Sequence, residues 1–169
     1  MPSLTARTFL EAVHIFAGLS EEVISDLSAS CVEVRADAGE LVVVEDVMGR
    51  ELFLIGEGRV RIVSGYSTSD AIELAELGAG EFFGEMSLIE CRRRAASAVA
   101  LDATRLFSLS NGDIHRLFKR HPDQFAILIL NISRDLSRRL RSMNARYAGL
   151  RNSLGYEDHA LPDPGLIAG

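Results

Sequence analysis

The chain has 169 residues with a formal net charge of −6 at pH 7, and 47% of its residues are hydrophobic. Its length suits one domain with a single core, and its apolar content excludes an intrinsically disordered chain. The negative charge argues against non-specific binding to nucleic acid or anionic lipid, because phosphates attract positive fields.

The cysteines and the apolar runs indicate a cellular compartment. Cys31 and Cys91 are too few for a disulfide framework or a structural zinc site. The first seven residues lack the basic and apolar stretches of a signal peptide. The longest apolar run, residues 125–130, is too short to cross a bilayer. We therefore expect a cytoplasmic protein with no membrane partner and no metal site.

The chain begins with apolar residues at helical spacing, which predict a helix over residues 4–16. A glycine at position 18 then breaks the pattern. Ser20 is a suitable N-cap for a second helix over residues 21–29.

From Cys31 onward the apolar pattern becomes alternating and β-branched residues accumulate. Gly56 to Gly58 interrupts one of the runs. Strands are predicted over residues 31–35, 40–45, 52–55, 60–63, 72–77, 98–101 and 105–109. Many short strands at regular spacing favour a closed antiparallel sandwich or barrel.

Helical signals return at the end of the chain. Ser110 and Asp113 resemble a capping box that opens a short helix ending near Lys119. Pro122 suits the first turn of a long helix over about residues 123–152.

The long helix carries an apolar seam of about three heptads. It consists of four residues seven apart and three between them, namely Ile129, Leu136, Met143 and Leu150 with Ile132, Leu140 and Tyr147. Packing on its own domain accounts for the seam as far as Ile132. Beyond Leu136 we expect a partner helix instead, with a homodimer as one form of that contact.

A glycine-rich segment separates the predicted strands around residues 78–97. Its glycines, at 78, 80 and 84, let the backbone turn tightly and approach a ligand, but their spacing is not that of a dinucleotide-binding loop. Residues 86–90 are long enough for one or two helical turns, whose N-terminal N–H groups suit an anion.

Within this segment, Phe83-Gly84-Glu85-Met86-Ser87-Leu88-Ile89 is followed by Arg94-Ala95-Ala96-Ser97. The pattern resembles the phosphate-binding cassette of the cyclic nucleotide-binding domain family, which includes the bacterial catabolite activator and the regulatory subunits of cAMP-dependent protein kinase. The resemblance covers about residues 8–145.

The resemblance implies a mainly β fold with flanking helices. The expected fold is an antiparallel β-roll (a double-stranded β-helix, jelly-roll-like) with N-terminal helices and a long C-terminal helix. Residues 1–124 would form the β-roll with its flanking helices, residues 125–152 a lid or dimerisation helix, and residues 153–169 a flexible tail.

The resemblance also assigns the site. The ligand would be cAMP or cGMP, with no other cofactor, and Arg94 would bind the phosphate while Glu85 accepts from the ribose 2′ hydroxyl. Ala95 resembles members that prefer cAMP. The expected ligand-binding residues are Phe83, Gly84, Glu85, Met86, Ser87, Arg94, Ala95 and Ala96, and Met143 and Asn144 fall where the family contacts the base.

Other interpretations remain open on the residues alone. In isolation, Arg94 with its two neighbouring arginines indicates a solvated basic turn, and Glu85 an acid that complements a helix N-terminus. A degenerate β-roll that binds no nucleotide and serves as an interaction or dimerisation scaffold is the main alternative function.

Two classes of function are disfavoured. The four histidines are dispersed and no catalytic motif is present, so we expect no enzyme activity. Too few residues follow Asn152 for a winged helix, so we expect no DNA binding. The sequence thus predicts a stand-alone receptor that changes conformation with its ligand and signals to an effector protein it does not identify.

Overall fold

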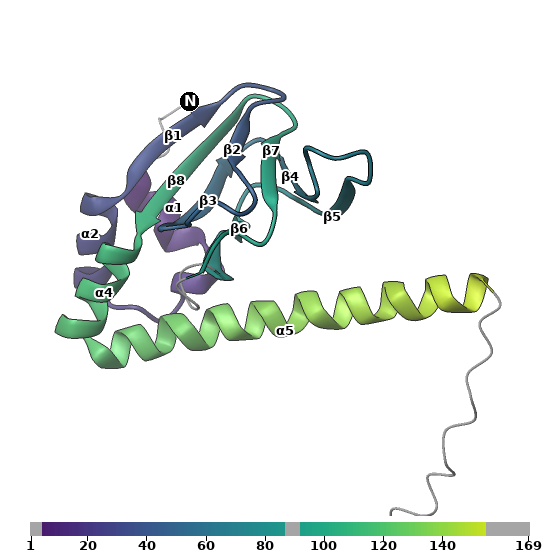
Figure 1. Cartoon of the computed structure of the whole chain (residues 1–169). Helices are drawn as coiled ribbons and strands as arrows, with labels where there is room; N and C mark the ends of the chain where they lie inside the picture. Colours follow the sequence, from purple (N-terminus) through teal and green to yellow (C-terminus); the bar gives the residue numbers. More distant parts are fainter. Residues whose placement is uncertain (1–4, 87–91, 155–169) are drawn as a thin grey trace, which may run out of the picture. The chain divides into compact units, whose positions relative to one another are not determined.

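The computed structural model of the chain describes residues 5–86 and 92–154 (Figure 1). Packing divides the chain into two units, Met1–Ile132 and Ser133–Gly169, which we describe separately. The expected division of roles at residues 124 and 152 stays a prediction.

The N-terminal region forms three short helices: α1 (Ala6–Ala12), the 3-10 helix η1 (His14–Phe16) and α2 (Glu21–Ser30). The prediction of one continuous helix over residues 4–16 was wrong, because Val13 adopts an extended backbone that ends α1. The predicted N-cap of α2 is confirmed, since the Ser20 hydroxyl accepts a hydrogen bond from the backbone N–H of Val23.

The described strands form two antiparallel sheets of four. The first has the order β1-β8-β3-β6 and the second the order β2-β7-β4-β5. The strands are β1 (Val32–Ala36), β2 (Leu41–Val43), β3 (Glu51–Glu57), β4 (Val60–Ser64), β5 (Ile72–Leu77), β6 (Phe82–Phe83), β7 (Ser97–Ala100) and β8 (Thr104–Ser110). This architecture confirms the predicted antiparallel β-roll with flanking helices.

Two details of the sheets differ from the strands predicted from the alternating apolar pattern. The interruption predicted at Gly56 is a register shift within β3, which continues to Glu57 along its neighbour β8. The two-residue strand β6 was missed, because two residues are too few to show a period.

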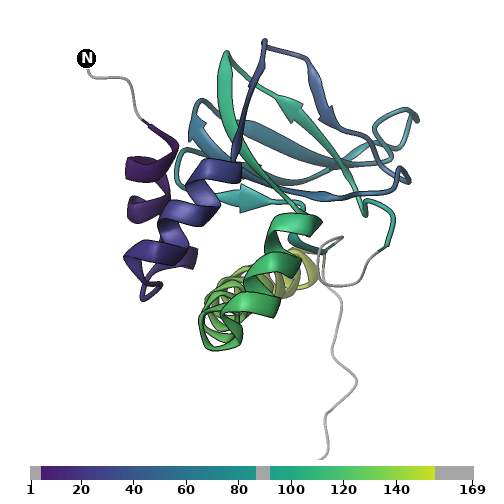
Figure 2. The same cartoon turned by 90° about the vertical axis from the view of Figure 1, so that its left-hand side faces the viewer.

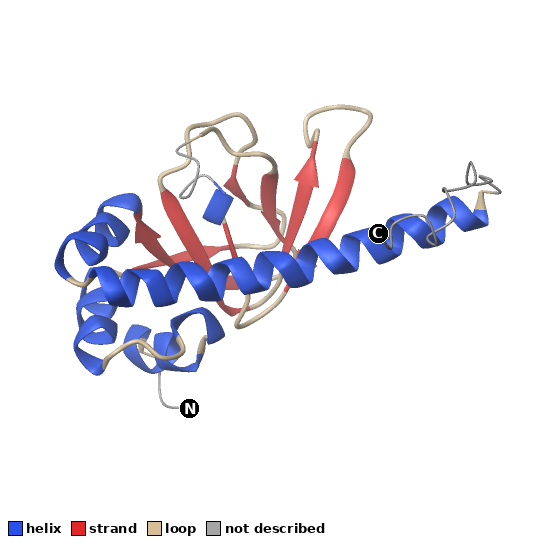
Figure 3. Ribbon diagram, turned by 90° about the horizontal axis from the view of Figure 1, so that it is seen from below, coloured by secondary structure: helices blue, strands red, loops and turns tan. Residues whose placement is uncertain are grey.

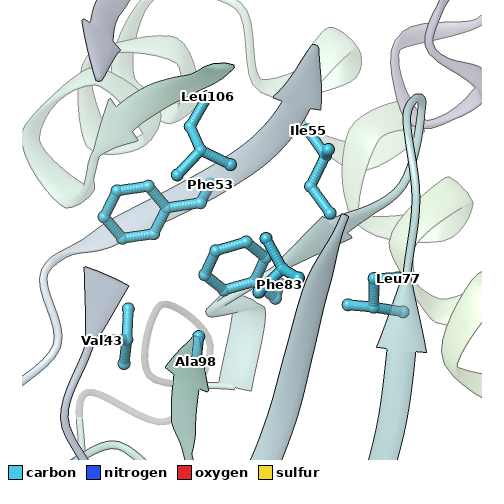
Figure 4. Close-up of a cluster of buried hydrophobic side chains, with 8 residues drawn as sticks. Val43, Phe53, Ile55, Leu77, Phe83, Ala98 and Leu106 are labelled. Atoms are coloured by element: carbon cyan, nitrogen blue, oxygen red, sulfur yellow. The ribbon is translucent and has the colours of Figure 1, made fainter. Parts of the chain in front are cut away.

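The core lies between the two sheets (Figure 4). Every strand except β1 contributes a fully or nearly fully buried side chain to it. The cluster is formed by Val43, Phe53, Ile55, Val60, Leu77, Phe83, Ala98 and Leu106. The Phe53 and Phe83 rings stack with centroids 5.2 Å apart, which fixes β6 against β3 just before the glycine turn.

Helices cover one end of the roll. Phe9 of α1 stacks on Phe107 of β8 at 4.8 Å, and α4 (Asn111–Arg120) follows β8 directly. The predicted capping box is confirmed, with Ser110 and Asp113 bonded reciprocally. Figure 2 shows α2, in dark blue, and α4, in green, lying beside one another.

Helix α5 (Pro122–Ser153) is a single continuous element (Figure 3). Its beginning belongs to the first unit, where Leu128 and Ile132 are fully buried. The Asn131 side-chain amide donates to the carbonyls of Ile15 and Ala17, at 3.0 and 2.9 Å. No helix within the described ranges is both long and apolar enough to span a membrane.

Candidate functional site

The short strand β6 leads directly into the turn at Gly84. The backbone there has a φ of +87°, and a Cβ would lie 2.6 Å from Nη1 of Arg94 and 2.8 Å from the carbonyl oxygen of Glu51. Two independent reasons therefore require glycine at this position: the positive φ, and the lack of space for a Cβ between its neighbours. Helical backbone begins immediately afterwards at Glu85.

Arg94 is held in place through its backbone. Its N–H donates to the carbonyl of Val47 at 2.8 Å, and its carbonyl accepts from the N–H of Asp46 at 3.0 Å. Among the residues that the structure describes, Asp46 is the only one other than glycine with a positive φ, 62°. The turn that pairs with the loop of Arg94 is therefore strained. The neighbouring Arg93 strengthens this pairing by donating to the Asp46 carbonyl.

The guanidinium of Arg94 lies inside the protein, with 6% of the residue exposed. Its Nη1 donates to the Gly84 carbonyl at 3.1 Å and its Nη2 to the Glu51 carboxylate at 3.2 Å. Its central carbon lies 5.7 Å from the centroid of the Phe53 ring. The fork is thus oriented between the glycine turn and the start of β3.

Burial and nearby acids act in opposite directions on this cation. Burial lowers the pKa of Arg94, and the charges of Glu51 and Glu85 partly offset that effect. An arginine stays protonated in proteins despite such a shift, so the site holds a permanent buried positive charge. Glu85 is itself 6% exposed, which places a carboxylate and a guanidinium in the same interior region.

The structure brings together only part of the predicted set. Phe83 is a core residue, Gly84 and Glu85 adjoin Arg94, and Met86 is about half exposed. After Arg94, Ala95 is exposed and Ala96 half-buried. Ser87 lies outside the described residues.

The two predicted base-contact residues belong to the second unit of the chain. Met143 and Asn144 are exposed residues of α5 in the second unit, and their role stays a prediction.

Sequence reasoning missed two neighbours of the guanidinium, Glu51 and Phe53. Glu51 is 43 positions before Arg94 and carries no local signal, because only the pairing of distant loops brings it there. Phe53 was recognised as a strand residue but not as the ring beside the arginine. Among the described residues, no group of three histidine, cysteine or acidic side chains is arranged to hold a metal ion.

The fold and the buried arginine are those expected of a β-roll that binds a small anion. A sequence model described as "Cyclic nucleotide-binding domain" matches residues 33–121, just over half of the chain. The chain therefore belongs to the cyclic nucleotide-binding domain family.

Individual relatives agree with this assignment. The "Cyclic AMP receptor protein" of Thermus thermophilus is 36% identical over 128 residues, covering 75% of this chain and 57% of that protein. The "Cyclic nucleotide-gated channel alpha-4" of Mus musculus is 29% identical over 125 residues, covering 70% of this chain and 21% of the channel. The chain thus spans less than two thirds of these two relatives.

A solved structure shares the fold over most of both chains. The cyclic nucleotide-binding domain from Methylobacillus flagellatus aligns with a TM-score of 0.74 and 26% identity, covering 84% of this chain and 83% of the other. Because the curated relatives are longer than this chain, the expectation that it does not bind DNA stays a prediction.

Proposed function

We propose that the protein is a receptor for a 3′,5′-cyclic nucleotide, with cAMP preferred to cGMP, that acts in the cytoplasm without catalysis of its own. The Arg94 guanidinium would bind the two exocyclic phosphate oxygens. Glu85 would accept a hydrogen bond from the ribose 2′ hydroxyl. Family membership supports the ligand class, and the positions of these two side chains support their roles.

The observation that carries the proposal is the buried position of Arg94. A charged side chain is expensive to remove from water unless it is paired and hydrogen-bonded. Here the guanidinium forms an ion pair with Glu51, whose side chain is 44% exposed. A phosphate oxygen would take the place of that carboxylate and accept a charge-assisted hydrogen bond from Arg94 in a position less exposed to solvent.

The preference for cAMP rests on the residue after Arg94. Ala95 has no hydroxyl to offer to the guanine amino group, as in the cAMP-preferring members that the cassette resembles. Met143 and Asn144 are proposed as base contacts, so Asn144→Ala should change the ratio of the two affinities more than it changes phosphate binding.

Signalling would use the helices that follow the roll. We infer that an occupied cassette shifts α4, and α5 after it, as a two-state lid. The effector would respond to that shift. A homodimer through the C-terminal helix is the alternative partner contact that the sequence offers.

The scaffold alternative has one specific observation in its favour. The Arg94–Glu51 ion pair neutralises part of the buried positive charge of Arg94 without any ligand. The β-roll therefore does not depend on a bound anion to balance that charge.

Isothermal titration calorimetry of the full chain with cAMP and cGMP tests both functions. Arg94→Ala should weaken binding by about 2–5 kcal/mol, because the phosphate loses its buried charged partner. Arg94→Lys should restore little of this, since an ammonium lacks the planar fork. Arg35→Ala, which removes an arginine with a 78% exposed side chain, is the matched control and should leave binding unchanged. Absence of heat with both nucleotides would support the scaffold.

A further inference from the structure

The part of α5 beyond the first unit, residues 133–154, carries a largely exposed apolar seam. Its members repeat at alternating steps of four and three, the spacing of positions a and d in a coiled coil. The exposed fractions run from 56% at Met143 to 73% at Leu154 for all members but Leu136, which is half-buried. The seam consists of Leu136, Leu140, Met143, Tyr147, Leu150 and Leu154.

The same segment is strongly basic in an acidic protein. Residues 133–154 contain six arginines, no lysine and one acid, Asp135, so their formal charge is +5. With −6 for the whole chain, the remaining residues carry −11. Asp135 is engaged within the helix itself, by Arg138 at 2.9 Å and Arg139 at 2.7 Å.

The arginines next to the seam determine which partner fits it. Helical spacing places Arg139 and Arg146 on one flank of the seam and Arg151 on the other, with Ser137 and Asn144 completing that second flank. Flanking residues of a coiled coil set partner choice through interhelical ion pairs. Neither flank offers an acid, so the preferred partner has acids of its own.

A second copy of this chain would meet like charges. A parallel in-register pair places Arg146 opposite Arg151 of the other copy, and an antiparallel pair sets the Arg139 and Arg146 flanks against each other. A membrane surface fits less well, because the seam is the narrow a/d stripe of a helix pair rather than a wide apolar face.

We propose that residues 133–154 dock an amphipathic helix of a separate protein, with an apolar seam flanked by glutamates or aspartates. Arginine forks suit such carboxylates because they bind them with two parallel hydrogen bonds. This inference rests on the proposed function in one respect only, that the partner is the effector of the receptor.

Two synthetic three-heptad peptides provide the probe. Both have leucine at every a and d position, and they differ only in carrying glutamate or lysine at every e and g position. Fluorescence anisotropy with the full chain should show roughly tenfold tighter binding of the glutamate peptide, weakening as salt is added. Arg146→Glu with Arg151→Glu should reverse the preference. Arg138→Glu with Arg141→Glu, the same charge change on the opposite face, should preserve it.

In the peptide experiment, three results would overturn the proposal: equal binding of the two peptides, binding of neither, or a preference that both double variants reverse equally. Sedimentation of the chain alone should give a monomer; a dimer that Leu140→Asp dissociates would assign the seam to self-association. Tighter binding of anionic vesicles or of duplex DNA than of the glutamate peptide would also refute it.

Calorimetry with cAMP on the same variants separates this inference from the proposed function. A chain that binds the nucleotide but neither peptide contradicts the docking proposal alone. A chain that prefers the glutamate peptide but binds no nucleotide supports the docking proposal and refutes the receptor.

Discussion

At the scale of single residues, the turn at Gly84 brings two distant parts of the chain into contact. Its backbone lies close to both the Arg94 guanidinium and the carbonyl of Glu51. A backbone carbonyl moves only with its strand, so this position has little room to adjust. The geometry of the candidate anion site therefore depends on the absence of a side chain at residue 84.

Gly84→Ala should lower the free energy of unfolding by more than 1 kcal/mol and weaken cyclic nucleotide binding, because the new Cβ displaces Arg94 or β3. Chemical denaturation and calorimetry measure the two effects. Gly80→Ala is the control, since Gly80 has nearly the same φ, +86°, but nothing within 4 Å of its added Cβ. Equal effects of the two substitutions would show that backbone conformation alone matters at residue 84.

In the proposed binding mode, Glu51 would compete with the phosphate for Arg94, with which it forms an ion pair, and its charge would also repel the anion. Glu51→Gln should therefore tighten cAMP binding several-fold, by about 1 kcal/mol at a dielectric near that of water, because the Glu51 side chain is 44% exposed. Glu57→Gln is the matched control, because Glu57 also pairs with an arginine, Arg105 at 2.7 Å, at the other end of β3. Weaker binding by Glu51→Gln would mean that the carboxylate orients the guanidinium rather than competing for it.

At the scale of elements, the start of α4 is stabilised by its capping box. Burial by itself would raise the pKa of Asp113, but hydrogen bonds from Ser110 and the charge of Arg116 outweigh it and lower the pKa. A depressed pKa in the folded state means that the ionised carboxylate stabilises the fold. That contribution is complete above the unfolded pKa of about 3.9 and is lost as pH falls through the lower folded value.

Asp113→Ala should cost about 1 kcal/mol of stability at pH 7, and the difference from the wild type should vanish in acid. Urea denaturation at a series of pH values measures it. Ser20→Ala removes the N-cap of α2, which has no titrating group, and its cost should not depend on pH in the same range. If the stability lost by Asp113→Ala did not change with pH, the charge of the carboxylate would be excluded as the source of the stabilisation.

The elements that were predicted well have strong local signals. Helix α5 was expected over residues 123–152 and is observed over Pro122–Ser153, because a proline and a long heptad repeat mark it. The failures have equally local causes. Val13 fits a helical period but adopts extended backbone, and β6 is too short to have a period.

At the scale of the whole molecule, ligand binding should stabilise the folded state by mass action. With cAMP at about 100 times its dissociation constant, the free energy of unfolding should rise by about 2.7 kcal/mol. Urea denaturation with and without cAMP measures the increase. For Arg94→Ala, the free energy of unfolding should not increase at the same ligand concentration. If cAMP left the urea midpoint of the wild type unchanged, that result would count against a cAMP site in the folded protein.

The fold class was open to prediction because many short alternating runs leave few architectures. The pairing of the strands could not be predicted in this way. Strand β1 pairs with β8, and the paired residues Val32 and Ser108 are 76 positions apart in the sequence. Local propensity contains no information about which distant strands meet; that outcome depends on how the two sheets bury their shared core.

By itself, the sequence indicated most of the element types and contained the family motif, because these depend on residues close together in the chain. The resemblance carried by that motif implied the β-roll and the roles expected of Arg94 and Glu85. Only the tertiary structure decided that Arg94 is buried and that Glu51 and Phe53 are its neighbours. Burial and long-range contacts are properties of the packed chain, and neither is encoded by the spacing of neighbouring residues.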